Sequence, residues 1–286
     1  MNQKIILGTA QFGLNYGINN SDGKPSEEEV FEILDLAFAS GINSLDTADA
    51  YGDSIALIGN YHKSRNSRFK VLSKFKNVKQ GELEPIINNS LDKLGILKFE
   101  VFSYHSFGDY LNNNDLIKDL LKLKSKGLIE KTGISVYSND ELVQAIKDIN
   151  IDVIQLPYNL LDNYNLRGSL IEKAKQKGKE IHVRSVFLQG LFFMDFDRFP
   201  EKLAPLKFYI KKIKDFCISE SLSIQTLALC YVLFNKSIDN VLIGVDNSSQ
   251  LLKYIRSIQN HENAIDFINS SVFVNETDLL NPVNWK

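Results

Sequence analysis

The stretch SEEEVFEILDLAFASGINSLDTADAYG, residues 26–52, reads as one helix followed by one strand, and this unit recurs along the chain. Ser26 and Glu29 form a capping box, in which a hydroxyl and a carboxylate satisfy free amide groups of the first helical turn. Apolar residues then follow with helical spacing as far as Gly41, and a glycine there suits a left-handed helix end. The apolar run 42–48 comes next and predicts a buried strand.

Short runs rich in isoleucine and valine alternate with longer segments of helical period. The expected strands are Ile5–Ala10, Ile42–Ala48, Phe69–Phe75, Glu100–Ser106, Lys131–Tyr137, Val153–Asn159, Ile181–Phe187 and Val241–Asp246. Besides the helix that ends before Gly41, we expect helices near 83–94, 116–126, 139–149, 170–177, 206–220, 223–235 and 248–259.

The expected strands are apolar on both sides, which is typical of parallel strands covered on both faces. No Pro/Gly/Ser-rich linker divides residues 1–286. We therefore predict one α/β domain, a (β/α)8 TIM barrel with a long loop at 188–205 and a short tail at 261–286. A doubly wound parallel sheet is the alternative.

The composition narrows the class of protein. Of the 286 residues, 44% are hydrophobic and 24% are charged, which excludes a disordered chain and a disulfide miniprotein. A net charge of −2 gives no basic excess for nucleic acid. Cys217 and Cys230 form no CxxC pair, and no signal peptide or apolar stretch of about 18 residues is present. We expect a cytoplasmic protein with no membrane or nucleic-acid partner, and the oligomeric state stays open.

Four side chains of complementary chemistry follow three neighbouring strands. Asp46 and Tyr51 follow the second strand, Lys74 lies at the end of the third and His105 at the end of the fourth. In a barrel these ends meet on one face, where catalysis takes place. An ammonium lowers the pKa of a nearby phenol, a carboxylate can hold that ammonium, and an imidazole can polarise a carbonyl. The set predicts proton donation to an oxygen that gains negative charge, as in hydride addition to an aldehyde or ketone.

Each of these residues also has an ordinary structural use, such as a turn cap, loop packing or a buried histidine, and only their coincidence favours a site. A lyase that uses Lys74 as a Schiff-base amine is a rival. The histidines show no HExxH or His-x-His spacing, so no metal site is expected. The absence of GxGxxG excludes the usual Rossmann fingerprint.

In these positions the chain resembles the aldo-keto reductase family. The matching segments are Leu7-Gly8-Thr9, Asp46-Thr47-Ala48-x-x-Tyr51-Gly52, Ser73-Lys74, His105, Lys126-Gly127 with Gly133-Ile134-Ser135, Ile154-Gln155 with Tyr158-Asn159, and Leu242-Ile243-Gly244. The resemblance implies a (β/α)8 barrel that binds NADPH or NADH across its strand ends and reduces a small carbonyl substrate. It also implies that Tyr51 is the general acid, that Lys74 lowers its pKa, that Asp46 holds Lys74, and that His105 orients the carbonyl.

The same resemblance implies a set of cofactor contacts. Ser135 and Gln155 would bind the nicotinamide carboxamide, and Gly244 with the helix start at Asn247 would receive phosphate, as helix N-termini do. The other positions expected to bind the cofactor are Gly8, Thr9, Asp46, Arg184, Ser185, Phe187, Gly190, Asp246 and Gln250.

Three residues depart from the family pattern. Val136 stands where an Asn is usual, so one carboxamide contact is in doubt. Arg184 replaces an aromatic residue that stacks on the nicotinamide ring; its planar guanidinium can stack too, or it can pair with a carboxylate and only shape the floor. Asp246 would repel the 2′-phosphate of NADPH and could accept hydrogen bonds from a ribose diol, which would favour NADH. Lys253 could partly offset this repulsion, so the choice between NADH and NADPH stays open. These changes keep a rival function open, a non-catalytic sensor that binds the nicotinamide cofactor.

The substrate end is expected to include Gln11, Phe12, Tyr16 and Tyr137. A polar Gln11, where many family members have a large aromatic, points to a hydroxylated substrate such as a sugar or sugar derivative. In the alternative view, the aromatic residues of this set only pack the loops. The leading prediction is an NAD(P)H-dependent carbonyl reductase.

Overall fold

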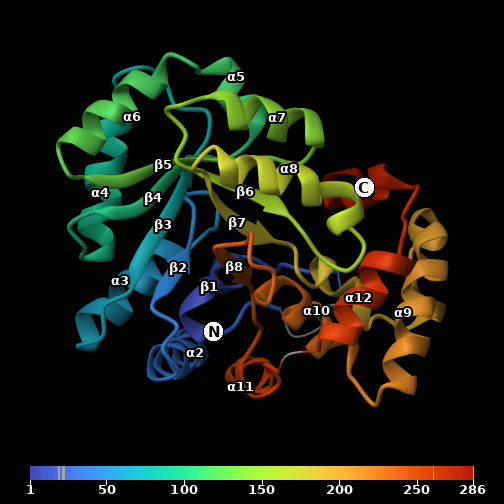
Figure 1. The fold of residues 1–286 in the computed structure, drawn as a ribbon. Helices are drawn as coiled ribbons and strands as arrows, with labels where there is room; N and C mark the ends of the chain where they lie inside the picture. The colour runs from blue at the N-terminus through green and yellow to red at the C-terminus, as the bar shows by residue number, and fades with distance from the viewer. Residues whose placement is uncertain (19, 21–22, 260, 286) are drawn as a thin grey trace.

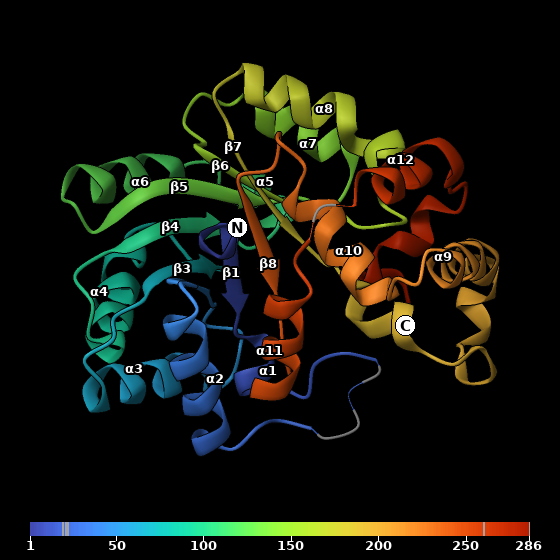
Figure 2. The same ribbon diagram turned by 60° about the horizontal axis from the view of Figure 1, so that its bottom comes forward.

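A computed structural model describes residues 1–18, 20, 23–259 and 261–285, and its eight parallel strands close into a barrel (Figures 1 and 2). Each strand pairs with the next one along the chain, and β8 returns to pair with β1. The strands are β1 (Ile5–Gly8), β2 (Ser44–Asp46), β3 (Lys70–Phe75), β4 (Phe99–Tyr104), β5 (Ile129–Ser135), β6 (Val153–Pro157), β7 (Glu180–Arg184) and β8 (Asn240–Ile243). The predicted (β/α)8 barrel is confirmed, and the doubly wound alternative is wrong.

Most helices surround the barrel, and neighbours such as α2, α3 and α11 pack side by side (Figure 2). The helices are α1 (Ala10–Gly13), α2 (Glu27–Ala39), α3 (Ser54–Ser64), α4 (Leu83–Leu94), α5 (Phe107–Asn112), α6 (Leu116–Ser125), α7 (Asn139–Lys147), α8 (Tyr164–Gln176), α9 (Lys207–Ser219), α10 (Ile224–Leu233), α11 (Ser248–Arg256) and α12 (Glu262–Ser271). The predicted capping box of α2 is formed in full, with Ser26 and Glu29 each bonding the other's backbone.

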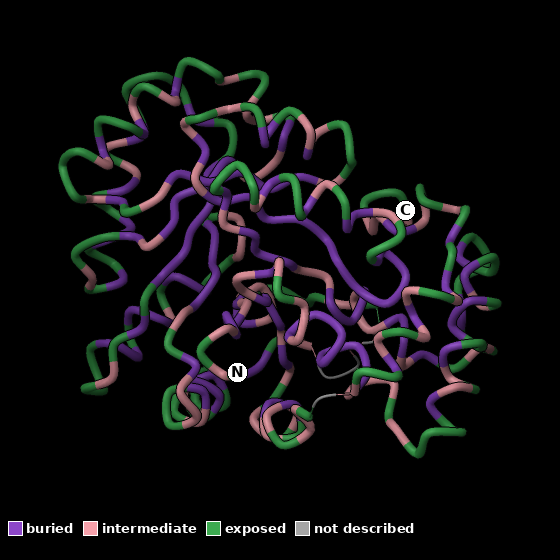
Figure 3. The backbone as a smooth tube through the Cα atoms, in the orientation of Figure 1, coloured by how far each residue is buried: buried purple, intermediate pink, exposed green. Residues whose placement is uncertain are grey.

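The buried hydrophobic residues form two clusters, and Figure 3 shows that much of the backbone of the strands is buried. The larger cluster lies between the strands and the surrounding helices. The smaller cluster consists of Ile6, Leu72, Val101, Val153 and Leu242. Successive side chains of a strand point to opposite faces, so residues two positions further on face the same way. Lys74 and Gln155, two residues beyond members of this cluster, therefore point inward above an apolar floor.

The strands end two or three residues earlier than most of the predicted ones. Beyond these ends the backbone continues to form hydrogen bonds with the neighbouring strand, as in Thr9 N–H to Asp46 O at 3.0 Å and His105 N–H to Phe75 O at 2.9 Å. The side chains expected at the strand exits therefore remain fixed by sheet-like hydrogen bonds, although several of them lie outside the strands proper.

Five helices differ from the prediction, of which the short helices α1 and α5 were not expected. Helix α3 was not expected, α8 begins at Tyr164 instead of residue 170, and α12 lies in what was expected to be a tail. The buried face of α8 includes Arg167 and Gly168, which interrupt the apolar pattern that the sequence shows. The long connection after β7 is confirmed and holds the short 3₁₀ helices Leu188–Phe193, Phe196–Arg198 and Glu201–Leu206.

Over the described residues, no single helix has the length and apolar character of a membrane span. One pair bent by 98°, Glu201–Ser219 with Ile224–Leu233, meets these two criteria only when its members are taken together.

Candidate active site

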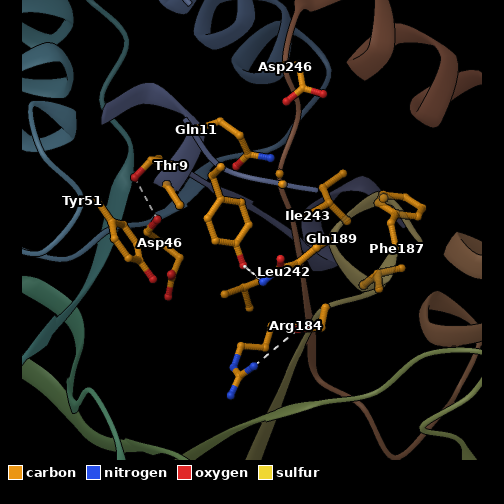
Figure 4. Close-up of a pocket in the computed structure, with 18 of the residues that line it drawn as sticks. Thr9, Gln11, Asp46, Tyr51, Arg184, Phe187, Gln189, Leu242, Ile243 and Asp246 are labelled. Carbon is orange, nitrogen blue, oxygen red and sulfur yellow. Dashed lines mark hydrogen bonds between the residues drawn. The ribbon is translucent and has the colours of Figure 1, made fainter. Parts of the chain in front are cut away.

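A cavity of about 230 Å³ opens at the carboxyl ends of the strands (Figure 4). Figure 4 shows Tyr51 and Asp46 on one side of it, Arg184 on another and Asp246 at a distance from all three. Eighteen of the expected site residues line this cavity: Gly8, Thr9, Gln11, Tyr16, Asp46, Tyr51, Lys74, His105, Ser135, Tyr137, Gln155, Arg184, Ser185, Phe187, Gly190, Gly244, Asp246 and Gln250.

The innermost part of the cavity holds a buried ion pair. The Lys74 ammonium donates to Asp46 Oδ1, and both side chains are only 4% exposed. Gln155 Nε2 donates to the other carboxylate oxygen, Asp46 Oδ2, at 3.0 Å. Burial opposes the charge on Lys74, but the Asp46 carboxylate and Tyr51 together raise the pKa of Lys74 above its ordinary value. Lys74 is therefore an ammonium at neutral pH.

Tyr51 lies between this pair and His105. The Lys74 Nζ atom is 5.6 Å from the centroid of the Tyr51 ring. Burial raises the pKa of the Tyr51 phenol above its ordinary value, while Lys74 acts in the opposite direction. The amine therefore contributes the lowering expected from the sequence, but desolvation outweighs it. The phenol keeps its proton at neutral pH, as a proton donor must.

The His105 ring meets Tyr51 edge-to-face, with centroids 6.0 Å apart. Burial lowers the pKa of His105 to about 4, and the neighbouring charges of Lys74 and Lys76 act in the same direction. Its buried Nδ1 atom has no hydrogen-bond partner within the described part of the chain. The imidazole is therefore neutral above pH 5 and carries one N–H donor.

Buried hydroxyl groups fix the loop that carries Tyr51. Ser54 Oγ donates to Thr9 Oγ1 at 2.6 Å, and Thr9 Oγ1 donates to the backbone oxygen of Asp46 at 3.0 Å. Thr47 Oγ1 lies 3.0 Å from the same Ser54 oxygen. The network joins the ends of β1 and β2 to the start of α3, so the loop between Thr47 and Ser54 is held at both ends.

Arg184 and Tyr137 form the opposite wall. The guanidinium carbon of Arg184 lies 4.1 Å from the centroid of the Tyr137 ring, which is a stacked cation–π contact. Arg184 Nη2 donates to Val136 O at 3.2 Å and to Ser135 Oγ at 3.4 Å. Pairing of Arg184 with a carboxylate was one of the two alternatives, and no ion pair of this residue exists over the described ranges.

At the end of the cavity near β8, the position of the Gln11 side chain differs from the one expected. A Cβ atom on Gly244 would overlap the side-chain amide of Gln11, so this amide lies directly over the glycine. Gln11 was expected at the substrate end, yet it reaches the place where phosphate was expected. Nearby, Gln250 Oε1 accepts the backbone N–H of Asp246 at 2.7 Å, and Asn247 caps α11 by accepting from Gln250 N–H at 2.9 Å.

Two expected site residues do not line the cavity. Phe12 has no exposed surface and packs in the larger hydrophobic cluster, because α1 turns it toward the helices. Asn247 is exposed and serves as the helix cap described above. Phe12 therefore has a packing role, as in the alternative that the expected substrate aromatics only pack the loops, although it packs in the core.

Several cavity residues were not among those expected from the sequence. They are Ala10, Gly17, Asn20, Val186, Gln189, Phe193, Leu242, Ile243 and Tyr254. Gln189 has a left-handed backbone with φ 54°, and its Nε2 atom donates to Tyr16 OH at 3.4 Å across the cavity. The loop after β1 and the loop after β7 thus meet here. Within the described ranges, no cluster of three His, Cys, Asp or Glu side chains is placed to hold a metal ion.

Residues 4–270 match the model of the Aldo/keto reductase family. Aldo-keto reductase str7 of Strobilurus tenacellus is 28% identical over 197 residues, which cover 65% of this chain and 57% of that protein. L-galactose dehydrogenase of Arabidopsis thaliana is 26% identical over 257 residues, covering 82% and 80%. Among solved structures, the holo form of aldo-keto reductase AKR11C1 from Bacillus halodurans superposes with a TM-score of 0.75 at 22% identity, covering 96% of this chain and 94% of that one. The matched segment thus spans just over half of str7, and the structural likeness supports the barrel.

Proposed function

The chain belongs to the aldo/keto reductase family of NAD(P)-dependent oxidoreductases, and we propose that it reduces an aldehyde or ketone to an alcohol with Tyr51 as the proton donor. The observation that carries the proposal is the grouping of Tyr51, the buried Lys74–Asp46 pair and the neutral His105 in one cavity.

The side chains present fit a nicotinamide cofactor. Gln155 uses its Nε2 atom to bind Asp46, which leaves its Oε1 atom as an acceptor for a carboxamide NH₂ group. Ser135 offers a hydroxyl beside it. Gly8 and Gly244 add no side chain of their own to the end of the cavity near β8, and the side chains of Gln11, Gln250 and Asp246 line that end. These residues would hold NADH or NADPH along the strand ends.

When bound, the reduced cofactor supplies a hydride to the carbonyl carbon. Tyr51 gives its hydroxyl proton to the carbonyl oxygen, so that the hydride and this proton together make the alcohol. The Lys74 ammonium stabilises the phenolate that forms, and Asp46 keeps Lys74 charged and in place. The N–H group of the neutral His105 orients the carbonyl oxygen and supports its developing negative charge.

A Schiff-base lyase fits this site poorly. A nucleophilic lysine needs a neutral amine, which proteins obtain by lowering its pKa. Here the pKa of Lys74 is raised and the ammonium is bound to a carboxylate, so the lone pair is not available.

For the substrate we propose a sugar or a related polyhydroxylated carbonyl compound. The Tyr16 and Gln189 side chains give the cavity polar groups that can bind hydroxyls. L-galactose dehydrogenase, a relative over most of the chain, is named for such a substrate. The Gln11 amide no longer supports this choice, because it lies over Gly244.

Two measurements test the function. The intrinsic fluorescence of the protein is titrated with NADH and NADPH side by side, and oxidation of the better cofactor is then followed with a panel of aldoses and simple aldehydes. The proposal expects saturable binding and turnover of at least one carbonyl compound. Absence of binding contradicts the cofactor assignment, whereas tight binding without turnover across the panel favours the sensor.

A further inference from the structure

Arg184 is a cation in the cavity wall, and among the described residues no carboxylate forms an ion pair with it. Buried or half-buried guanidinium groups in proteins are normally paired with a carboxylate. The acceptors of the Arg184 side chain are neutral: Val136 O, Ser135 Oγ and Ser185 Oγ, at 3.2 to 3.4 Å. Asp46 is bound by Lys74, and Asp162 is bound by Arg167 in a two-point contact of 2.7 and 2.9 Å.

The positive charge of Arg184 acts on the reaction centre. Burial raises the pKa values of Tyr51 and Tyr16, and the Arg184 charge acts in the opposite direction on both; it also acts against the charged form of Lys74. The guanidinium is held in this position by its stacking on Tyr137 and its bond to Val136 O. Tyr137 in turn is fixed by Arg167, whose Nη2 atom donates to the Tyr137 backbone oxygen at 2.6 Å. The cation is therefore a fixed part of the cavity.

Arg184 also borders the residues proposed to hold the nicotinamide carboxamide. Its Nη2 atom contacts Ser135 Oγ, and Ser135 pairs with Gln155 across strands β5 and β6. A ring bound through Ser135 and Gln155 is therefore a neighbour of the guanidinium. The oxidised nicotinamide ring carries a positive charge and the reduced ring carries none, so a fixed cation distinguishes the two by Coulomb repulsion.

We propose that Arg184 sets the redox preference of the cofactor site, because its unpaired guanidinium disfavours the oxidised ring and leaves the reduced ring bound. The site then retains NAD(P)H, releases NAD(P)⁺ and favours carbonyl reduction over alcohol oxidation. This inference rests on the proposed function, and it names Arg184 as the residue that biases the direction of the reaction.

The test compares dissociation constants of the oxidised and reduced cofactor, measured by calorimetry in the absence of any carbonyl compound. The wild type is expected to bind the reduced form at least about tenfold more tightly, since two charges a few ångströms apart repel even in a partly exposed site. Arg184→Met removes the charge but keeps an apolar side chain that can cover Tyr137, and the ratio of the two constants should fall about tenfold. Arg184→Gln, which is also neutral, should give the same fall.

Two controls separate charge from shape. Arg184→Lys keeps the charge without the planar group, and its ratio should stay close to that of the wild type. Arg68→Met removes a cation from an exposed position before β3, at the opposite end of the barrel, and should leave the ratio unchanged.

Each outcome bears on one of the two proposals. If the wild type binds both redox forms equally, or if the neutral variants keep its ratio, Arg184 does not set the preference, although the cofactor site stands. If the wild type binds neither NADH nor NADPH, the proposed function itself fails.

Discussion

The backbone of Gly13 lies against the backbone of Tyr51 so closely that a Cβ atom on Gly13 would overlap the Tyr51 carbonyl oxygen and lie 2.8 Å from Asp53 N. Gly52, which follows Tyr51 in the chain, has φ 52°, and a Cβ atom on Gly52 would overlap the backbone oxygen of Gly13. Two glycines thus allow α1 and the loop after β2 to touch. This contact, together with the hydroxyl network of Thr9, Thr47 and Ser54, sets the position of the Tyr51 side chain.

Gly13→Ala should therefore displace Tyr51. The atoms that the new methyl group meets belong to the backbone and cannot rotate away, so we expect kcat to fall at least tenfold and stability to fall by about 1–3 kcal/mol. Turnover and urea unfolding measure the two effects. Gly108→Ala on α5 is the matched control, because a Cβ atom there makes only an ordinary contact of 3.6 Å with Ser106 Oγ. An unaltered kcat in the Gly13 variant would show that this contact does not position Tyr51.

Asp46 and Lys74 form a buried ion pair, so their contributions to the free energy of unfolding should be coupled. Asp46→Asn leaves the ammonium without its counter-charge, and removal of one partner of a buried pair costs about 3–5 kcal/mol. The double variant Asp46→Asn/Lys74→Met should lose less stability than the sum of the single variants, while turnover is lost in all three. Urea unfolding of the four proteins gives the coupling. Lys211→Met, which breaks an exposed pair with Asp215, should cost less than about 1 kcal/mol. Additive single effects would contradict a coupled pair.

The barrel could be predicted from the sequence because strands and helix starts are both indicated by short local patterns. Isoleucine- and valine-rich runs predict strands, and caps such as Ser26 with Glu29 predict where helices begin. Helix α3 was missed although Ile55, Ile58 and His62 lie on its buried face, because Gly59 and several polar residues weaken the pattern. Gly59 is needed there, since a Cβ atom would overlap Lys93 O of the next helix, and no local pattern reveals that contact.

His105 should make folding sensitive to acid. In the unfolded chain its pKa returns to the ordinary value of 6.5, whereas burial holds it at about 4 in the folded protein. Between these values the unfolded state binds the proton, so the stability due to neutral His105 is complete above pH 6.5 and is lost as the pH falls toward 4. The loss amounts to about 3 kcal/mol at most.

The measurement compares the wild type with His105→Gln in urea at pH 7.5 and pH 4.5. The wild type should lose more stability than the variant between these two values, while His62 and the carboxylates contribute equally to both proteins. Parallel losses would contradict a depressed pKa at His105.

Asp246 should disfavour NADPH. It lines the cavity at the end expected to receive the adenosine half of the cofactor, and its carboxylate would repel a 2′-phosphate. Asp246→Ser should raise NADPH affinity relative to NADH by about tenfold at low salt, and by less at high salt because exposed charges are screened. Fluorescence titration gives both affinities, and Asp215→Ser, an exposed carboxylate on α9, is the control. A constant ratio in the Asp246 variant would remove this residue from cofactor selection.

The sequence predicted the site residues at the strand exits better than those in the loops. Residues at strand exits, such as Lys74 and His105, could be placed because a parallel barrel brings all such exits to one face. Ser135 and Gln155 were predicted from the resemblance to the family. Gln11 lines the predicted cavity, but its amide lies over Gly244, because the direction of a loop side chain depends on which backbone lies beside it. Gln189 was missed for a related reason: its backbone is left-handed and its oxygen accepts the Ile18 N–H at 3.2 Å, a contact between distant loops that a single sequence does not show.

Replacement of Tyr51 by Phe tests the central claim most directly. The Tyr51→Phe variant lacks only the hydroxyl, so NADH and NADPH should bind as they do in the wild type. With the best carbonyl compound of the panel, its kcat should fall by at least about a hundredfold, the usual contribution of a positioned general acid. Cofactor affinity and kcat are measured on the same preparation. Turnover close to that of the wild type would contradict the account, because the proton would then come from another group.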